Sequence, residues 1–105
     1  MADTLKILGA ATLTTSSAEI YKPAAGASAI VSSFRLVNKS TSAATTVEGT
    51  VGASTYYIIP RYMDLAACYG YVDEAPITLD SSQPMKFWAT TAAIVDCTIF
   101  GVEHT

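Results

Sequence analysis

Apolar and polar side chains alternate along much of this chain of 105 residues. Such alternation is typical of β-strands that have one face in a core and one face outside it. The clearest examples cover residues 45–51, 85–91 and 94–102. Clusters of Gly, Pro, Ser, Thr and Asn separate these segments and are typical of turns. The pattern therefore predicts short strands joined by turns.

The longest alternating segment, residues 28–38, predicts a strand with two different faces. Ile30, Phe34 and Leu36 fall on one face, which we expect to lie in the core. The other face carries the side chains of Val31, Ser33, Arg35 and Val37. An arginine between valines indicates that this second face has surroundings that are only partly aqueous.

Two other strands are predicted to place a large or charged side chain outside the core. In residues 45–51 the alternation directs Val47 inward and Glu48 outward. In residues 85–91 it directs Phe87 inward and Trp88 outward.

Weaker strand patterns cover residues 4–13, 18–22, 55–59 and 75–79. Residues 61–71 allow two interpretations, because four apolar positions have helical spacing but a long loop fits them equally well. The total of about seven to eight strands predicts an all-β fold, an antiparallel β-sandwich or jelly roll. The length predicts a single domain over residues 1–105, in which residues 1–13 form either the first strand or an N-terminal arm.

Composition narrows the classes of function. Only 14% of the residues are charged, against about 25% in an ordinary domain, and the net charge is −3. The six cations are scattered, so we expect no binding to nucleic acid, which requires clustered Lys and Arg. We also expect no membrane partner, because no apolar run reaches the length of a membrane span.

The chain begins without the pattern of an export signal, so we expect synthesis in a cytoplasm. Synthesis there favours buried thiols over a disulfide for Cys68 and Cys97. A disulfide between the two cysteines remains the alternative if the mature protein leaves the cell.

Residues for catalysis are scarce. The single histidine, His104, is next to the last residue, where a general base would be poorly held. Asp73 and Glu74 are adjacent, so in a strand they point to opposite faces. Neither the cysteines nor the acids have the spacing of a metal site. We therefore expect neither an enzyme nor a bound cofactor.

Aromatic residues are the most informative group. Five tyrosines fall between residues 56 and 71, and neighbours such as Tyr56 and Tyr57 cannot both face one core from a strand. Exposed aromatic residues on a weakly charged surface are typical of interfaces. The interface residues that we predict are Tyr56, Tyr57, Tyr62, Tyr69, Tyr71 and Trp88. A sugar-stacking platform, with Asp64, Asp73 or Asp80 as hydrogen-bond acceptors, would use the same residue types.

Three segments resemble small virion proteins of tailed bacteriophages. In residues 18–33 an Ile-Tyr pair leads through Pro and Gly into an apolar strand that ends in Ser-Ser. An Asn with Ser, Thr and Ala follows in residues 38–46, and the ending in residues 77–103 is also similar. Gln83-Pro84 departs from the Gly-Asp that such proteins often have, and residues 61–71 have no counterpart.

The resemblance implies a non-enzymatic β-sandwich subunit of a virion. Our first hypothesis is a capsid decoration or cement protein that binds the major capsid protein and forms a homo-oligomer, a trimer or a dimer. The alternatives are a component of the neck, tail or baseplate, or a carbohydrate- or receptor-binding module of a tail fibre.

Overall fold

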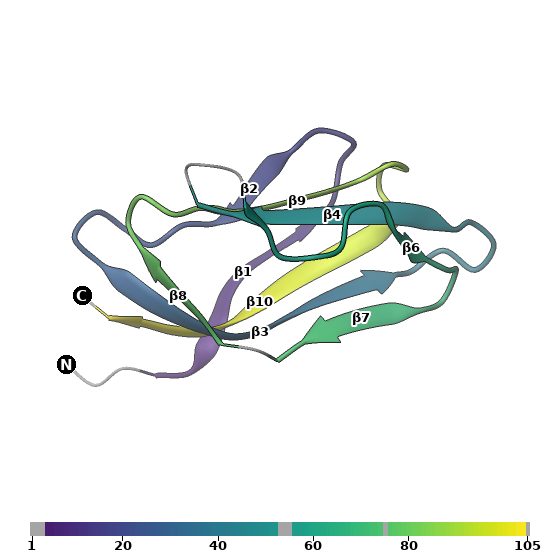
Figure 1. The fold of residues 1–105 in the computed structure, drawn as a ribbon. Helices are drawn as coiled ribbons and strands as arrows, with labels where there is room; N and C mark the ends of the chain where they lie inside the picture. Colours follow the sequence, from purple (N-terminus) through teal and green to yellow (C-terminus); the bar gives the residue numbers. More distant parts are fainter. Residues whose placement is uncertain (1–3, 53–55, 75, 105) are drawn as a thin grey trace.

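The computed structural model describes residues 4–52, 56–74 and 76–104. This part of the chain is all-β: ten strands form two antiparallel sheets that face each other, and none of the described residues is helical. Figure 1 shows the two layers, with β4 and β9 in the upper sheet and β3 and β10 in the lower one. The predicted all-β sandwich is therefore confirmed.

We call the lower sheet sheet A. Its order is β1-β10-β3, and both β7 and β8 pair with the far side of β3, at different ends of that strand. Its strands are β1 (Lys6–Thr12), β3 (Ser28–Asn38), β7 (Gly70–Asp73), β8 (Ile77–Asp80) and β10 (Val95–His104).

We call the upper sheet sheet B. Its order is β2-β9-β4, and β5 and β6 both pair with the far side of β4. Its strands are β2 (Ala18–Tyr21), β4 (Thr45–Val51), β5 (Tyr56–Tyr57), β6 (Met63–Leu65) and β9 (Met85–Ala89).

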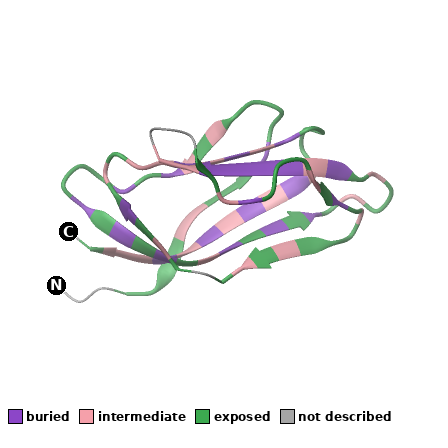
Figure 2. Cartoon of the chain, viewed as in Figure 1, coloured by how far each residue is buried: buried purple, intermediate pink, exposed green. Residues whose placement is uncertain are grey.

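The core lies between the sheets, and buried positions alternate with exposed ones along the strands (Figure 2). Phe34 of sheet A and Phe87 of sheet B are both fully buried, with ring centroids 5.2 Å apart. The predicted inward face of residues 85–91 is confirmed, since Met85 and Phe87 are buried. In residues 94–102 the alternation itself is confirmed, and the structure shows that Val95 and Ile99 are on the buried face.

The prediction for residues 28–38 is correct at one end of the strand and wrong at the other. Phe34 and Leu36 are buried as expected, but Val31 is buried and Ile30 is 54% exposed. The reason is a β-bulge: Phe100 pairs with Ser33 while Gly101 pairs with Val31, so one residue of β3 is extra. An extra residue moves every following side chain to the other face.

Residues 61–71 form neither a helix nor one long loop. They contain a turn, the short strand β6, a second turn and the start of β7. Tyr62 and Cys68 have positive φ angles of 58° and 65°, which a right-handed helix does not allow. This backbone reverses the chain at Tyr62 and carries it from sheet B to sheet A after β6.

The strand that we predicted for residues 55–59 is shorter in the structure, and its residue 55 lies outside the described residues. β5 contains only Tyr56 and Tyr57, and both side chains are exposed. Ile59, beyond the strand, is the residue that enters the core.

The segment predicted over residues 4–13 contains β1, which pairs with β10, while residues 1–3 lie outside the described residues. The strand predicted over residues 75–79 is β8, displaced toward Asp80, and residue 75 is likewise not described.

The turn after β3 depends on Asn38, whose side chain is completely buried. Its Nδ2 donates to the carbonyl oxygens of Ala43 (2.9 Å) and Leu65 (3.1 Å), and its Oδ1 accepts from the Ser40 N–H (3.0 Å). Asn38 therefore connects the end of β3 in sheet A to β6 in sheet B.

Candidate functional site

A buried carboxylate lies on the outer face of sheet B, the face directed away from the core. On β4, Val47 and Gly49 face the core, so Glu48 points outward as predicted. Glu48 is nevertheless only 7% exposed. A charged group out of contact with water requires hydrogen-bonding partners, and Glu48 has two.

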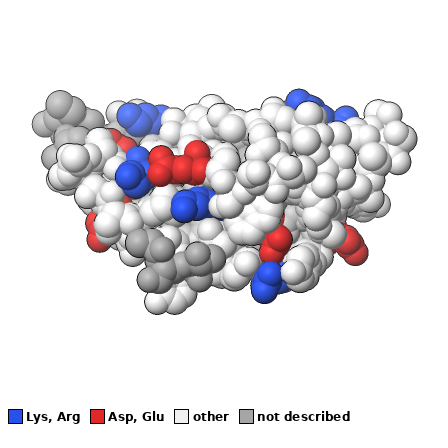
Figure 3. Space-filling model, turned by 90° about the horizontal axis from the view of Figure 1, so that it is seen from above, with Lys and Arg blue, Asp and Glu red and all other residues white. Residues whose placement is uncertain are grey.

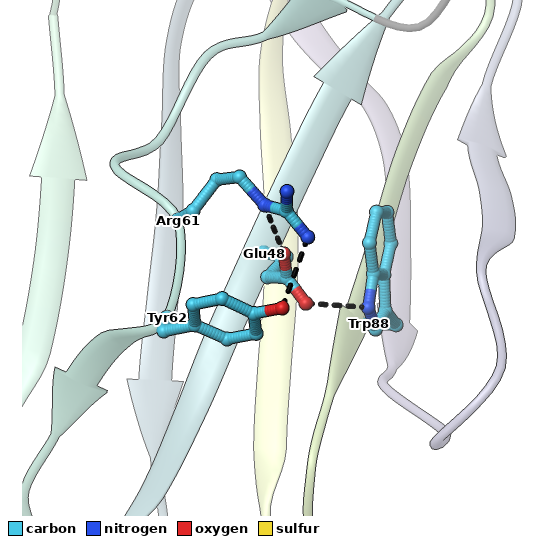
Figure 4. Close-up of polar contacts among 4 residues, drawn as sticks. All are labelled: Glu48, Arg61, Tyr62 and Trp88. Atoms are coloured by element: carbon cyan, nitrogen blue, oxygen red, sulfur yellow. Dashed lines mark hydrogen bonds and ion pairs between the residues drawn. The ribbon is translucent and has the colours of Figure 1, made fainter.

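The first partner is Trp88, directly opposite Glu48 on β9. The Trp88 Nε1–H donates to Glu48 Oε2 at 3.0 Å. The second partner is Arg61, whose Nε lies 3.5 Å from Glu48 Oε1. Figure 4 shows the carboxylate held between these two side chains.

Arg61 comes from the turn between β5 and β6, and two tyrosine rings flank its guanidinium. Its Cζ lies 4.8 Å from the ring centroid of Tyr57 and 4.9 Å from that of Tyr62, distances typical of cation–π contacts. Its Nη2 donates to the Tyr62 hydroxyl at 3.0 Å. The phenol groups of Tyr57 and Tyr62, and then Glu48, raise the pKa of Arg61 above its usual value.

Tyr57 also contacts the edge of the Trp88 ring, with centroids 6.4 Å apart. These contacts join side chains from three strands and one turn into a single unit. We call this unit the Arg61 cluster; its members are Glu48, Tyr57, Arg61, Tyr62 and Trp88.

The structure brings together three of the six predicted interface residues. Tyr57, Tyr62 and Trp88 belong to the Arg61 cluster. Tyr56 is 66% exposed, and among the described residues its side chain makes no hydrogen bond or ring contact with the cluster.

Tyr69 and Tyr71 lie with sheet A instead. Tyr69 is exposed just before β7. Tyr71 packs against the ring of Phe34, with centroids 6.1 Å apart, and its hydroxyl donates to Asp73 Oδ2 at 3.4 Å. Burial, followed by the nearby Asp73 carboxylate, raises the pKa of Tyr71.

Sequence reasoning missed two members of the cluster, Glu48 and Arg61. The outward direction of Glu48 was predictable, but its burial was not. Trp88 is 40 positions away in the chain and meets Glu48 only because β4 pairs with β9. No local pattern reports such a pairing.

The three aspartates that a sugar-stacking platform would use do not lie together in the structure. Asp64 is on β6 of sheet B, whereas Asp73 and Asp80 are on β7 and β8 of sheet A. Asp80 accepts hydrogen bonds from the Ser82 hydroxyl and N–H, which lower its pKa. Within residues 4–52, 56–74 and 76–104, no group of three or more His, Cys, Asp or Glu residues is placed to hold a metal ion.

A second surface feature lies on the outer face of sheet A. It is an open groove of about 430 Å³, lined by Leu5, Lys6, Ile7, Ser32, Ser33, Arg35 and Phe100. Leu5 and Ile7 are 65% and 59% exposed. The Arg35 guanidinium lies over the Phe100 ring at 5.8 Å.

Both cysteines are free thiols in this structure. Cys97 is buried in the core, as we expected of the thiols, but Cys68 is exposed. The exposure of Cys68 follows from its position in the turn between β6 and β7.

Comparison with known proteins identifies no relative: no family model, no curated protein and no solved structure matches the chain. The resemblance to phage virion proteins therefore rests on the sequence motifs alone. The described residues also contain no helix that is long and apolar enough to cross a membrane.

Proposed function

We propose that this protein is a non-enzymatic structural subunit of a bacteriophage virion, a capsid decoration or cement protein that binds the major capsid protein and copies of itself. The observation that carries the proposal is the Arg61 cluster. Trp, Tyr and Arg are the residue types that contribute most to protein–protein binding, and here exposed Tyr57, Arg61 and Tyr62 form one group with the half-buried Trp88. Figure 3 views the outer face of sheet B, where charged side chains of both signs lie in small groups separated by uncharged surface.

The chemistry of the cluster supports binding and not catalysis. The carboxylate of Glu48 already accepts hydrogen bonds from Trp88 and Arg61, so it is a poor general base. Its role is to hold the indole and the guanidinium in fixed positions. Side chains that are fixed before binding lose less conformational entropy when a partner arrives.

As a cement protein, the subunit would hold neighbouring capsid subunits together against the pressure of the packaged DNA. Each contact could be weak, because many copies bind the same particle at once. The low surface charge supports this role, since little charge has to be desolvated when the faces are covered.

The proposal is tested with particles of the phage that encodes the chain, prepared without this protein. Purified protein is added back, and its density is located by electron cryo-microscopy. We expect ordered density on the head. Density on the neck, tail or baseplate would contradict the decoration role and support the first alternative. Binding to a glycan array together with absence from the head would support the receptor-binding alternative.

The contribution of the Arg61 cluster is tested with Tyr57→Ala in the same assay. We expect particle occupancy to fall while the midpoint of urea unfolding changes little, because Tyr57 is 40% exposed. Tyr69→Ala is the matched control, since Tyr69 is exposed but lies with sheet A. Equal occupancy for wild type and Tyr57→Ala would remove the cluster from the interface.

A further inference from the structure

Large apolar side chains are exposed around the groove on the outer face of sheet A. Leu5 and Ile7 are two positions apart, so they point to the same side, and both line the groove. The start of β1 is exposed (Figure 2). Ile30 of β3 and Val72 of β7 are exposed as well, and Val72 lies opposite Arg35, another residue of the groove. Exposed apolar surface with polar groups beside it is typical of a binding site.

The groove is positively charged. Lys6 and Arg35 line it and are exposed, and neither makes an ion pair or a side-chain hydrogen bond with a described residue. The Arg35 guanidinium lies over the ring of Phe100. A guanidinium that stacks by its face keeps the N–H groups at its edge available for an acceptor. The groove therefore offers two unpaired cations next to apolar side chains.

The acids of sheet A do not neutralise these cations. Asp96 on β10 accepts a hydrogen bond from Thr12 Oγ1 at 2.7 Å and pairs with Lys39 Nζ at 3.1 Å. Glu74, just beyond β7, is exposed and forms no ion pair with a described cation. None of the described acids on or next to the strands of sheet A lines the groove; they are Asp73, Glu74, Asp80, Asp96 and Glu103.

We propose that this groove binds an extended peptide segment of a partner protein, whose acidic side chains pair with Arg35 and Lys6 and whose apolar side chains cover the apolar residues of the groove. Carboxylates form strong, charge-assisted hydrogen bonds with such cations. Ser33, opposite Phe100 on the same face, adds a hydroxyl that makes no hydrogen bond with a described residue. The charge and the apolar surface of the groove are thus both complementary to an acidic, apolar segment.

The shape of the groove favours a protein segment over other anionic ligands. The groove is open and has a volume of about 430 Å³, whereas sites for small molecules enclose most of the ligand surface. A peptide continues past the ends of an open groove and gains contacts with the neighbouring face. Anionic membranes are typically bound by clusters of about four to eight Lys and Arg, and this groove has two cations. Nucleic acid likewise requires clustered cations.

This inference goes beyond the proposed function. It concerns the face of the sandwich opposite the Arg61 cluster, and it rests neither on that cluster nor on the virion assignment. A protein with a binding surface on each outer face can hold two other proteins together.

The test is an NMR titration of the full chain with a synthetic peptide. The peptide has blocked ends and carries Glu and Leu in turn at every second position, with Ser between them. In an extended peptide these Glu and Leu side chains point to the same side. We expect the amide signals of Leu5, Ile7 and Ser33 to shift, while the indole signal of Trp88 on sheet B does not. A matched peptide with Gln in place of Glu should bind about tenfold more weakly.

Substitutions in the groove test the two cations. Arg35→Gln and Lys6→Gln should each raise the dissociation constant of the Glu peptide about tenfold. Lys22→Gln is the matched control, because Lys22 is an exposed cation that follows β2 of sheet B, and it should leave the affinity unchanged. All three side chains are exposed, so the midpoint of urea unfolding should stay the same.

A second measurement uses the wild type alone and so cannot fail through misfolding. Added salt screens the attraction between carboxylates and exposed cations. The affinity for the Glu peptide should therefore fall as the salt concentration rises. An affinity that does not respond to salt would contradict the role of Lys6 and Arg35.

The outcomes separate this inference from the proposed function. Absence of shifts in the groove, equal affinity for the Glu and Gln peptides, or shifts confined to sheet B would each overturn the inference. Binding to vesicles that contain phosphatidylglycerol, without binding to the peptide, would assign the groove to a membrane surface and overturn it as well. Each of these results leaves the particle-binding assay to decide the proposed function. Conversely, peptide binding by a protein that does not bind particles would support the inference and overturn the virion assignment.

Discussion

At the scale of single residues, Glu48 and Arg61 show how a polar group becomes buried on the outside of a sheet. Glu48 starts from an outward position, but Trp88 and Arg61 cover it from two sides. A buried carboxylate with good partners adds little net stability, yet removing a partner is costly. The arrangement is better explained by the fixed geometry that it imposes on Trp88 and Arg61.

This explanation predicts the effect of Glu48→Ala. The Trp88 Nε1–H would lose its acceptor, so the free energy of unfolding should fall by about 2 kcal/mol. Urea unfolding measures the loss, and Trp88 fluorescence should change because the indole environment changes. Glu48→Gln, which keeps an acceptor oxygen, should lose about half as much. Glu19→Ala is the exposed control, and a loss as large as that of Glu48→Ala would contradict the prediction.

The cysteines give a second prediction at this scale. Burial raises the pKa of the Cys97 thiol to about 12, whereas Cys68 is exposed. Because the thiolate is the reactive form, iodoacetamide at about pH 8 should modify one thiol per chain quickly and the other only in denaturant. Cys68→Ser should remove the fast reaction. Rapid modification of Cys97 in the native protein, detected by mass spectrometry, would contradict its burial.

The raised pKa of Cys97 also determines in which direction pH changes the stability of the fold. A thiol whose pKa is higher in the folded state than its ordinary value of 9.0 favours folding while it is protonated. Its contribution is therefore present below about pH 9 and is lost as the pH rises through the folded value.

At the scale of the strands, two bulges meet at one point of β10. The bulge in β3 lies opposite Phe100 and Gly101, and a second bulge in β1 lies opposite Ile99 and Phe100. A Cβ atom on Gly101 would lie 2.2 Å from the Ile30 carbonyl oxygen and 2.9 Å from Leu8 Cδ1. Only glycine allows the neighbouring backbones to approach β10 this closely.

Gly101→Ala should therefore destabilise the protein strongly, by about 3 kcal/mol, because the contact is with backbone that cannot move away. The measurement is urea unfolding followed by far-UV circular dichroism. Gly70→Ala is the matched control at an exposed strand end, where the added Cβ would come no closer than 3.3 Å to the Leu36 carbonyl oxygen. Similar losses for the two variants would contradict the assigned role of the bulges.

At the scale of the whole molecule, one core joins the two sheets, and the outer faces differ. Sheet B presents the Arg61 cluster, and sheet A presents the apolar groove with Leu5 and Ile7. The chain crosses between the sheets repeatedly, for example from β9 to β10, so neither sheet is a continuous segment. We expect such a structure to unfold as one unit.

The measurement compares two probes in the same urea titration. Trp88 fluorescence reports on sheet B, and far-UV circular dichroism reports on the strands of both sheets. The two midpoints should coincide, and Phe87→Ala should lower both by the same amount because Phe87 contacts Phe34 across the core. Separate midpoints would contradict the prediction of a single domain.

The alternation of side chains determined more of this fold than any composition value. Residues 85–91 have their buried face where the pattern places it, residues 94–102 alternate as predicted, and the all-β class follows from the strand count. These features are local, because a strand with one face in the core must alternate. The motif resemblance pointed to a virion protein by sequence alone, and it stays a proposal.

The tertiary structure decided what depends on pairing between distant segments. The bulge that buries Val31 and exposes Ile30 arises from the register of β3 against β10, which no local pattern encodes. Likewise, Tyr57 and Trp88 share a site, whereas Tyr71 packs against the core from the other sheet, because their strands belong to different sheets. Sequence spacing determines which way a side chain points along its own strand, but only the pairing of strands determines which side chains it meets.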